Sequence, residues 1–351
     1  MERCIPANES VIYTAPVSGG PDVLKMGDRR MPDKEERGRG PVSRGGFGIA
    51  VAMVFMLALP AVLTLHTVRV APVVDPTVTD PTPYGYTVSL LLFLVSIAGI
   101  GFWFVPQEGV KISKKAFWST IAVLFPLGAA LDFFFAHIFF VFPNRSATLG
   151  VKAPALGGGV PVEEYAFYLL GFIVVLLMYI WLDESWLSAY TVPGESEERI
   201  GFERLLQFHP LSAVVAVVLI AAAIVYKRFF SAEPDGFPGY FTFLVLMALT
   251  PAVALFPEAR SVINWRAFSL TFFVILLTSL LWEATLAIPY GWWGYQGRQM
   301  MGLRVTAWSG LPIEAVMVWL AVTFSTVVVY EIVKRWKGSG RTARAAFLGK
   351  A

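Results

Sequence analysis

Cysteine, histidine and charged residues are scarce in this sequence of 351 residues. The single cysteine, Cys4, excludes an intramolecular disulfide and a cysteine metal site. The three histidines do not form an HExxH pattern, and neither GxGxxG nor a P-loop motif occurs. Charged residues make up 15% and hydrophobic residues 56%, against about 25% and 45–50% in soluble proteins. The composition excludes a soluble protein and predicts no metal site.

Long hydrophobic runs recur along most of the chain. A helix of about 20 apolar residues crosses a bilayer core about 30 Å thick. We expect eight such spans, at about 46–66, 85–105, 116–139, 163–182, 209–226, 237–256, 267–288 and 312–333. The expected fold class is therefore an all-α integral membrane protein. Residues 1–45 are polar, lack a continuous apolar segment and are expected to form a disordered leader.

The distribution of basic residues predicts the orientation in the membrane. An even number of spans places both ends of the chain on one side. That side would hold 21 of the 28 Lys and Arg residues, and the opposite side seven. Because Lys and Arg accumulate in cytoplasmic loops, we expect both termini in the cytoplasm, with the chain in the cytoplasmic membrane if it is prokaryotic. The orientation in the membrane explains the distribution of the basic residues, so they do not indicate a nucleic-acid partner.

An internal repeat divides the hydrophobic region. A shift of 151 residues aligns 85–183 with 236–334 without a gap, and places "KAFWSTIAVLFPLGAALD" over "RAFSLTFFVILLTSLLWE". We expect a 4+4 tandem repeat of spans, parallel because four is an even number. The predicted organisation is a cytoplasmic leader (1–45), a first repeat (46–183), a linker (184–208), a second repeat (209–334) and a basic cytoplasmic tail (335–351).

Five acids lie inside or at the mouth of apolar spans: Asp132, Glu163, Glu164, Glu283 and Glu314. A charge in the membrane is costly, so each acid is a candidate for function. Asp132 and Glu283 occupy matching positions about two thirds along their spans, with apolar neighbours on both sides. The predicted topology brings all five acids to the outer half of the membrane, where one cavity could hold them.

Only one of the neighbouring acids Glu163 and Glu164 has a counterpart in the second repeat. Glu163 matches Glu314, and both follow a proline, which is also ordinary chemistry for the start of a helix. Ala315 stands where Glu164 would be. Adjacent helical residues point about 100° apart, so Glu163 and Glu164 should face different surroundings. We expect an acid and a base among this set, with the matched pair near the repeat axis and Glu164 as an extra group.

Aromatic residues crowd the same segments. The rings of a water-excluded cavity can stabilise a carbocation by cation–π attraction. The alternative is an aromatic belt at the membrane surface, which would explain Trp292 and Trp293 equally well. The aromatic residues predicted to contact a substrate are Phe135, Tyr165, Phe167, Tyr168, Trp282, Trp292, Trp293, Tyr295 and Trp308. An acid in a dry aromatic cavity suits protonation of an alkene.

The paired Pro-x-Glu motifs resemble those of the membrane-integral lycopene cyclase family, whose two homologous modules are fused or split between two polypeptides. "GVPVEEYAFY" matches the family pattern, whereas "GLPIEAVMVW" keeps Pro312 and Glu314 but has Ala315 for the second acid. "GWWGY" at 291–295 resembles the Gly-Trp-x-Tyr of the family's linking loop, but the first half has "FVFPN" there. The resemblance covers 85–183 and 236–334.

The resemblance implies a site for cyclisation of a linear carotenoid lined by Asp132, Glu163, Glu164, Glu283 and Glu314. This chemistry is redox-neutral, and no cofactor is evident, although a missing motif leaves a flavin-type requirement open. The implied partners are a lipid-soluble carotenoid or polyprenoid and the membrane lipids. The Ala315 departure leaves the substrate and ring isomer open, and the oligomeric state is not indicated.

Three other functions fit parts of the pattern. A carotenoid 1,2-hydratase makes the same cation but lets water capture it, and another polyprenoid could be the substrate of a cyclase. An ion- or proton-coupled transporter also uses parallel repeats and acids inside the membrane. Transporters more often break corresponding helices, and here the mid-span prolines Pro126 and Pro251 do not correspond under the shift of 151.

Overall fold

The structure is a computed structural model that describes residues 82–191 and 204–349, all within one unit of the chain, Arg44–Ala351. Three regions predicted from the sequence lie outside these ranges: the leader, the first span at 46–66 and the middle of the linker. The described residues are mostly helical, as expected.

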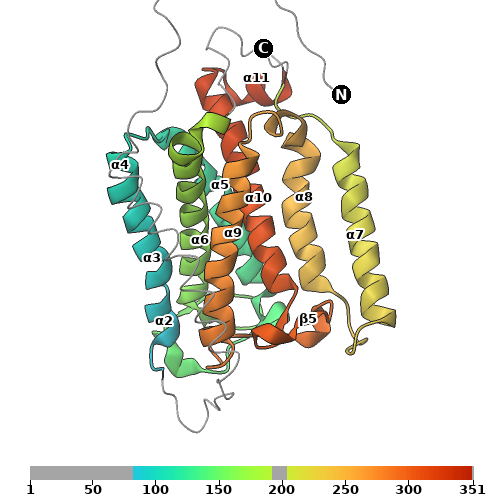
Figure 1. Ribbon diagram of the computed structural model, residues 1–351. Helices are drawn as coiled ribbons and strands as arrows, with labels where there is room; N and C mark the ends of the chain where they lie inside the picture. Colours follow the sequence, from blue (N-terminus) through green and yellow to red (C-terminus); the bar gives the residue numbers. More distant parts are fainter. Residues whose placement is uncertain (1–81, 192–203, 350–351) are drawn as a thin grey trace, which may run out of the picture. The chain divides into compact units, whose positions relative to one another are not determined.

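Seven helices in the described ranges are long and apolar enough to cross a membrane (Figure 1). They are a composite helix (Gly85–Gln107), α5 (Lys114–Phe139), α6 with its extension (Val162–Trp186), α7 (Pro210–Phe229), α8 (Gly239–Ala259), α9 with its extension (Trp265–Ala287) and α10 (Glu314–Gly338). Each coincides with an expected span to within a few residues. The chain is an integral membrane protein by this measure.

Three of these helices contain a π-helical turn. The composite helix runs from α2 (Gly85–Ser89) through α3 (Leu91–Ala98) and η1 (Gly99–Phe104) to α4 (Val105–Gln107). The α6 helix proper (Val162–Trp181) continues as η3 (Leu182–Trp186), and α9 proper (Trp265–Trp282) as η6 (Glu283–Ala287). π-Turns inside helices often occur at functional sites, and η6 begins at the mid-span acid Glu283.

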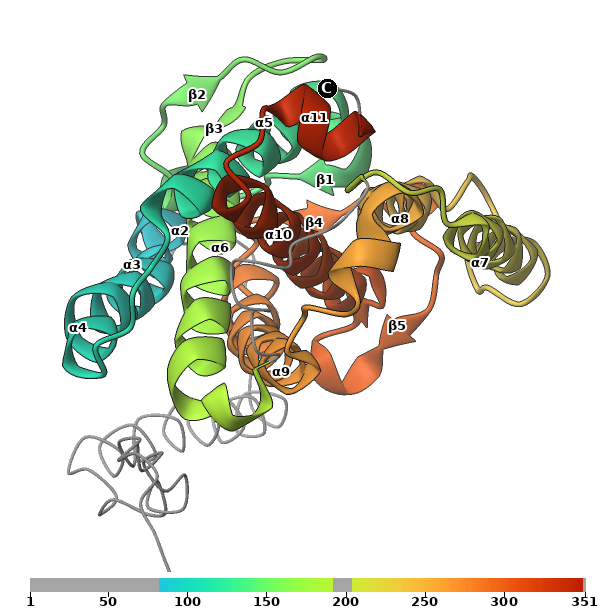
Figure 2. The same cartoon turned by 90° about the horizontal axis from the view of Figure 1, so that it is seen from above.

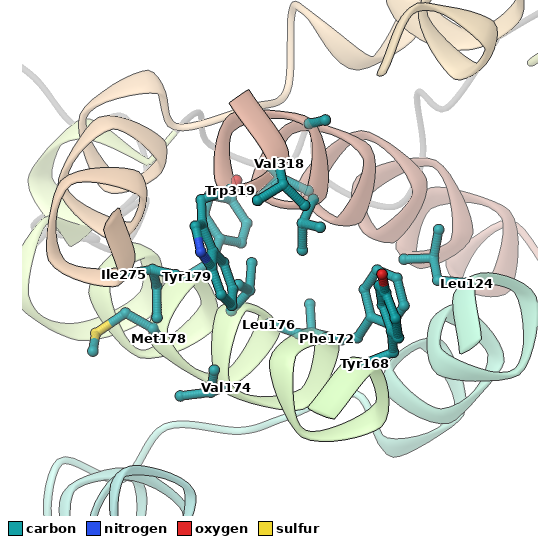
Figure 3. Packing of buried hydrophobic residues seen from close by; sticks show 14 of the residues in the cluster. Leu124, Tyr168, Phe172, Val174, Leu176, Met178, Tyr179, Ile275, Val318 and Trp319 are labelled. Atoms are coloured by element: carbon teal, nitrogen blue, oxygen red, sulfur yellow. The ribbon is translucent and has the colours of Figure 1, made fainter. Parts of the chain in front are cut away.

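Helices α6 and α10 form the centre of the packing. In the apolar window of α10 78% of the residues are buried, and in that of α6 67%, against 22% in α7. Figure 2 shows α10 among α5, α6, α8 and α9, with α7 beyond α8. Tyr168 and Phe172 of α6 face Val318 and Trp319 of α10 (Figure 3). The two most buried helices are therefore those that follow the Pro-x-Glu motifs.

Six short strands lie at one end of the helices, which we call the strand end. Strand β1 (Phe140–Val141) pairs with β4 (Gly294–Tyr295), β2 (Lys152–Ala153) with β3 (Val160–Pro161), and β5 (Arg304–Val305) with β6 (Leu311–Pro312), all antiparallel. The 3₁₀ turns η2 (Arg145–Ala147) and η7 (Gly297–Gln299) belong to the same loops. The β1–β4 pair joins loops from the two predicted repeats and closes this end over the helices.

Buried polar contacts order the opposite end. Asn264 caps α9, because its side-chain oxygen accepts hydrogen bonds from the amides of Arg266 and Ala267. Its amide group donates to Asp183 at 3.0 Å and so ties the start of α9 to the end of α6. The predicted basic tail contains a short helix, α11 (Ala343–Leu348).

Candidate functional site

Two carboxyl groups, Glu164 and Glu283, line one small cavity near the strand end. Glu164 lies in the first turn of α6, directly after β3, and Glu283 begins η6. The other residues that line the cavity are Tyr86, Phe140, Phe167, Tyr168, Tyr240, Trp282, Trp293, Tyr295 and Val318. Both predicted repeats therefore contribute an acid and several rings. None of these residues is a cation.

The aromatic rings of the cavity touch one another almost continuously. The centroid of Trp282 lies 4.5 Å from that of Trp293, and Tyr86 lies 4.9 Å from Trp293. On the other side, Phe140 and Tyr240 are 5.1 Å apart, at nearly perpendicular planes. Such walls offer ring faces to a cation. The cavity measures about 30 Å³, which is room for about two water molecules.

Hydroxyl groups hold both acids in place. The Tyr86 hydroxyl donates to Glu164 at 2.6 Å. Glu283 accepts two hydrogen bonds, one from the Tyr295 hydroxyl and one from Ser279 at 3.1 Å. Burial raises the pKa of Tyr295 well above its usual value, and the negative charge of Glu283 raises it further. The Tyr295 hydroxyl therefore keeps its proton and remains a donor at physiological pH.

Asp132 of α5 is fully buried, and neither of its carboxyl oxygens has a hydrogen-bond partner within the described residues. It is close enough to Glu164 for the two carboxyl groups to interact electrostatically, and Glu164 interacts in turn with Glu283. Glu164 and Glu283 thus share the cavity, whereas Asp132 does not line it.

Glu163 and Glu314 hold loops of the strand end. Glu163 accepts hydrogen bonds from the Thr87 hydroxyl at 2.5 Å and from the backbone amide of Leu149 at 2.8 Å. Glu314 accepts one from the amide of Met301 at 2.5 Å. The two acids thus bind matching loops, with one carboxyl oxygen each left buried and unpartnered. They do not line the cavity of Glu164 and Glu283.

No protein-family model, curated protein or solved structure matches this chain. The described residues also contain no group of three or more His, Cys, Asp or Glu side chains that could hold a metal ion. The assignment of a function therefore depends on the geometry of the cavity itself.

Five of the nine predicted aromatic contacts line the cavity: Phe167, Tyr168, Trp282, Trp293 and Tyr295. Trp292 is buried next to it, stacked on Tyr86. The remaining three lie elsewhere. Tyr165 turns outward and donates its hydroxyl to the carbonyl of Pro154, and Trp308 packs against a small separate cluster that includes Leu311. Phe135 is 38% exposed and contacts Phe139 and Phe243 outside the cavity.

Three aromatic residues of the cavity were not predicted: Tyr86, Phe140 and Tyr240. Tyr86 and Tyr240 occupy the first turns of their helices, a position that also fits an interfacial belt. The shift of 151 places Phe237 and Ser89 opposite them, so the repeat gives no sign of a shared role. The available signal was the "GYT" at the beginning of the second span, in which Tyr86 directly follows the repeated Gly85.

Proposed function

We propose that this chain is a carotenoid cyclase that forms an ionone ring at the end of a linear, lycopene-type polyene in the membrane. One observation carries the proposal: two carboxyl groups with different hydrogen-bond partners share a cavity walled by aromatic rings and free of cationic residues. The motif resemblance supports the same reaction. The double bonds of a polyene are the groups that a carboxylic acid can protonate. Protonation of such a bond is the first step of cyclisation.

The hydrogen bonds suggest which acid gives a proton and which takes one. Hydrogen bonds donated to a carboxyl group favour its ionised form. Glu283 accepts two hydroxyl donors and Glu164 accepts one. We therefore assign Glu164 as the acid and Glu283 as the base. Asp132 has no hydrogen-bond donor within the described residues and is buried outside the cavity, so we assign it no direct part in the proton transfers.

The reaction balances without an oxidant or water. The Glu164 O–H bond breaks as its proton forms a C–H bond at the terminal double bond of the polyene. The resulting cation is attacked by the neighbouring double bond, and the new C–C bond closes the ring. Glu283 then removes a proton from the carbon beside the cation, and the electrons of that C–H bond form the ring double bond. The proton returns to Glu164 before the next turnover.

The aromatic rings stabilise the cationic intermediate of this reaction. The positive charge exists only between the two proton transfers, so attraction to the faces of Trp282, Trp293 and Tyr86 stabilises the intermediate more than the neutral substrate. Exclusion of water also prevents capture of the cation as an alcohol. The cavity is too small in this structure for the end of a polyene, because even an apolar cavity that binds benzene measures about 150 Å³.

A lipid-soluble substrate would enter from the bilayer between α5 and α8, which both pack on α10. At this position a row of aromatic side chains leads from the lipid-facing surface to the cavity. Phe135 is partly exposed and stacks on Phe139 at 5.5 Å, and Phe139 contacts the cavity residue Tyr240 at 5.1 Å. Rotation of these side chains would open a path without moving a helix. Phe135 thus keeps a role near the substrate, although outside the cavity.

The architecture proposed with this function has eight spans in a parallel 4+4 repeat, with both termini in the cytoplasm. Two features support the repeat. First, α5 and α9 begin 151 residues apart, at Lys114 and Trp265. Second, the loop amides bound by Glu163 and Glu314 belong to Leu149 and Met301, which are 152 residues apart. The strand end would then face away from the cytoplasm.

Expression in bacteria that accumulate lycopene tests the function. Pigments would be separated by chromatography and identified by mass spectrometry. A cyclase yields a product of unchanged mass and altered retention, whereas a hydratase adds the mass of one water. Correctly inserted protein that leaves lycopene unaltered would refute cyclisation of this substrate.

A further inference from the structure

A second and larger cavity opens at the strand end, beside β1. Its volume is about 390 Å³, within the range of roughly 300–1,000 Å³ typical of small-molecule sites. The polar residues that line it are His137, Asn144, Arg145, Thr148, Lys152 and Gln296. Phe140 lines both this cavity and that of the two acids, so β1 separates the two. The proposed cyclisation uses none of the six polar residues.

The charge of this cavity is positive. Arg145 and Lys152 contribute two cations, and no acid lines it. Neither cation takes part in an ion pair within the described residues. Glu163, the acid nearest along the chain to Lys152, is engaged elsewhere by Thr87 and the Leu149 amide. Two cations in one concave site without an acid favour an anionic ligand.

Ordered backbone holds the two cations. Arg145 begins η2, which Asn144 caps by accepting a hydrogen bond from the amide of Ala147. Lys152 lies in β2, where a side chain on neighbouring Gly159 would come within 2.8 Å of the Lys152 Cβ. The glycine therefore permits the close packing of this strand pair. The turn and the strand pair thus fix the backbone from which both cations extend.

We propose that this cavity binds a phosphate ester. The guanidinium of an arginine can donate two parallel hydrogen bonds to a phosphate, and a lysine adds a point charge. The apolar side chains of Phe140, Val141 and Phe142 line the same cavity and would contact the carbon part of the ligand. Both an anionic phospholipid headgroup and a soluble phosphate ester have this chemistry. This site is independent of the proposed cyclase activity.

Native mass spectrometry of the full-length protein in detergent tests the proposal. The probes are dioleoylphosphatidylglycerol and glycerol 3-phosphate. The double variant Arg145→Gln/Lys152→Gln should bind the lipid about tenfold or more weakly than wild type, since two charge-assisted contacts are lost. The control is Arg228→Gln, which removes an exposed cation in the last turn of α7 that does not line the cavity. It should bind like wild type.

The two probes distinguish the source of the phosphate. Binding of the lipid alone identifies a headgroup site, and binding of both shows that the phosphate group suffices. Charge reversal by Lys152→Glu should weaken binding further than Lys152→Gln. Equal affinities for wild type, the double variant and the control would overturn the proposal, as would failure of both probes to bind the folded wild-type protein.

Discussion

The neighbouring acids Glu163 and Glu164 permit a matched comparison of two substitutions. Glu164→Gln removes the proton that the proposed reaction transfers, while the amide oxygen can still accept from Tyr86. Loss of a general acid typically lowers the rate by about 10²–10⁴-fold, which corresponds to about 2.7–5.4 kcal/mol of transition-state stabilisation. We expect this variant to be inactive but nearly as stable as wild type.

Glu163→Gln should have the opposite profile. Its amide oxygen can keep the bonds from Thr87 and Leu149, but the new NH₂ group takes the position of a carboxyl oxygen that has no partner. A buried polar group without a partner costs about 1–3 kcal/mol, so the melting temperature should fall. The rate per folded molecule should stay within a few fold of wild type.

The two variants would be compared in membranes from a lycopene-accumulating host. Pigment conversion is divided by the amount of folded protein, measured by size-exclusion chromatography, and the melting temperature is measured in detergent. A folded Glu163→Gln that is inactive, together with an active Glu164→Gln, would refute the assignment. The catalytic pair would then be the acids that follow the prolines.

Three further results are expected. Tyr295→Phe should lower the conversion rate by about 10–100-fold, because a hydrogen bond to a charged acceptor such as Glu283 contributes about 1.5–3 kcal/mol. Gly85→Ala should destabilise the protein by about 1–3 kcal/mol, since the added carbon would lie 2.5 Å from the Trp292 ring. Reporters fused to the C-terminus and to the loop between α5 and α6 should give opposite signals.

Matched controls accompany these tests. Tyr290→Phe removes a tyrosine hydroxyl from the same loop, outside the cavity, and should keep the wild-type rate. Gly99→Ala adds a carbon in the same helix where no atom lies within 4 Å, so the melting temperature should hold or rise. Equal losses for each variant and its control would contradict the contacts described, and identical reporter signals would contradict the predicted orientation.

The positions of the helices were predictable from the sequence, because a membrane span needs a long apolar run and little else. The acids were equally visible, since Asp132 and Glu283 interrupt such runs. The directions in which the acid side chains point were less predictable. The 100° step between helical neighbours predicted different surroundings for Glu163 and Glu164, but it could not say which one faces a cavity. Which acid faces the cavity depends on how α6 is rotated about its own axis. The sequence does not determine this rotation, because α6 is apolar on all sides.

The aromatic contacts show the same limit. Trp282 and Phe167 line the cavity. Tyr165 and Trp308 are aromatic too, but their side chains contact loop residues instead. Tyr240 reaches the cavity from a helix whose start has no acid and no motif. Its contribution follows from the packing of α8 on α10, a long-range contact that no local pattern records.

The division of the cavity between the two halves of the chain has a consequence for complementation. Glu164 and Tyr86 come from the first half, and Glu283 and Tyr295 from the second, with β1 and β4 pairing across the boundary. Each half alone would possess only one of the two acids that line the cavity, so neither could complete the two proton transfers of the proposed reaction. Two separately expressed halves should be inactive individually and should regain activity together, with the β1–β4 pair as part of the surface through which they recognise each other.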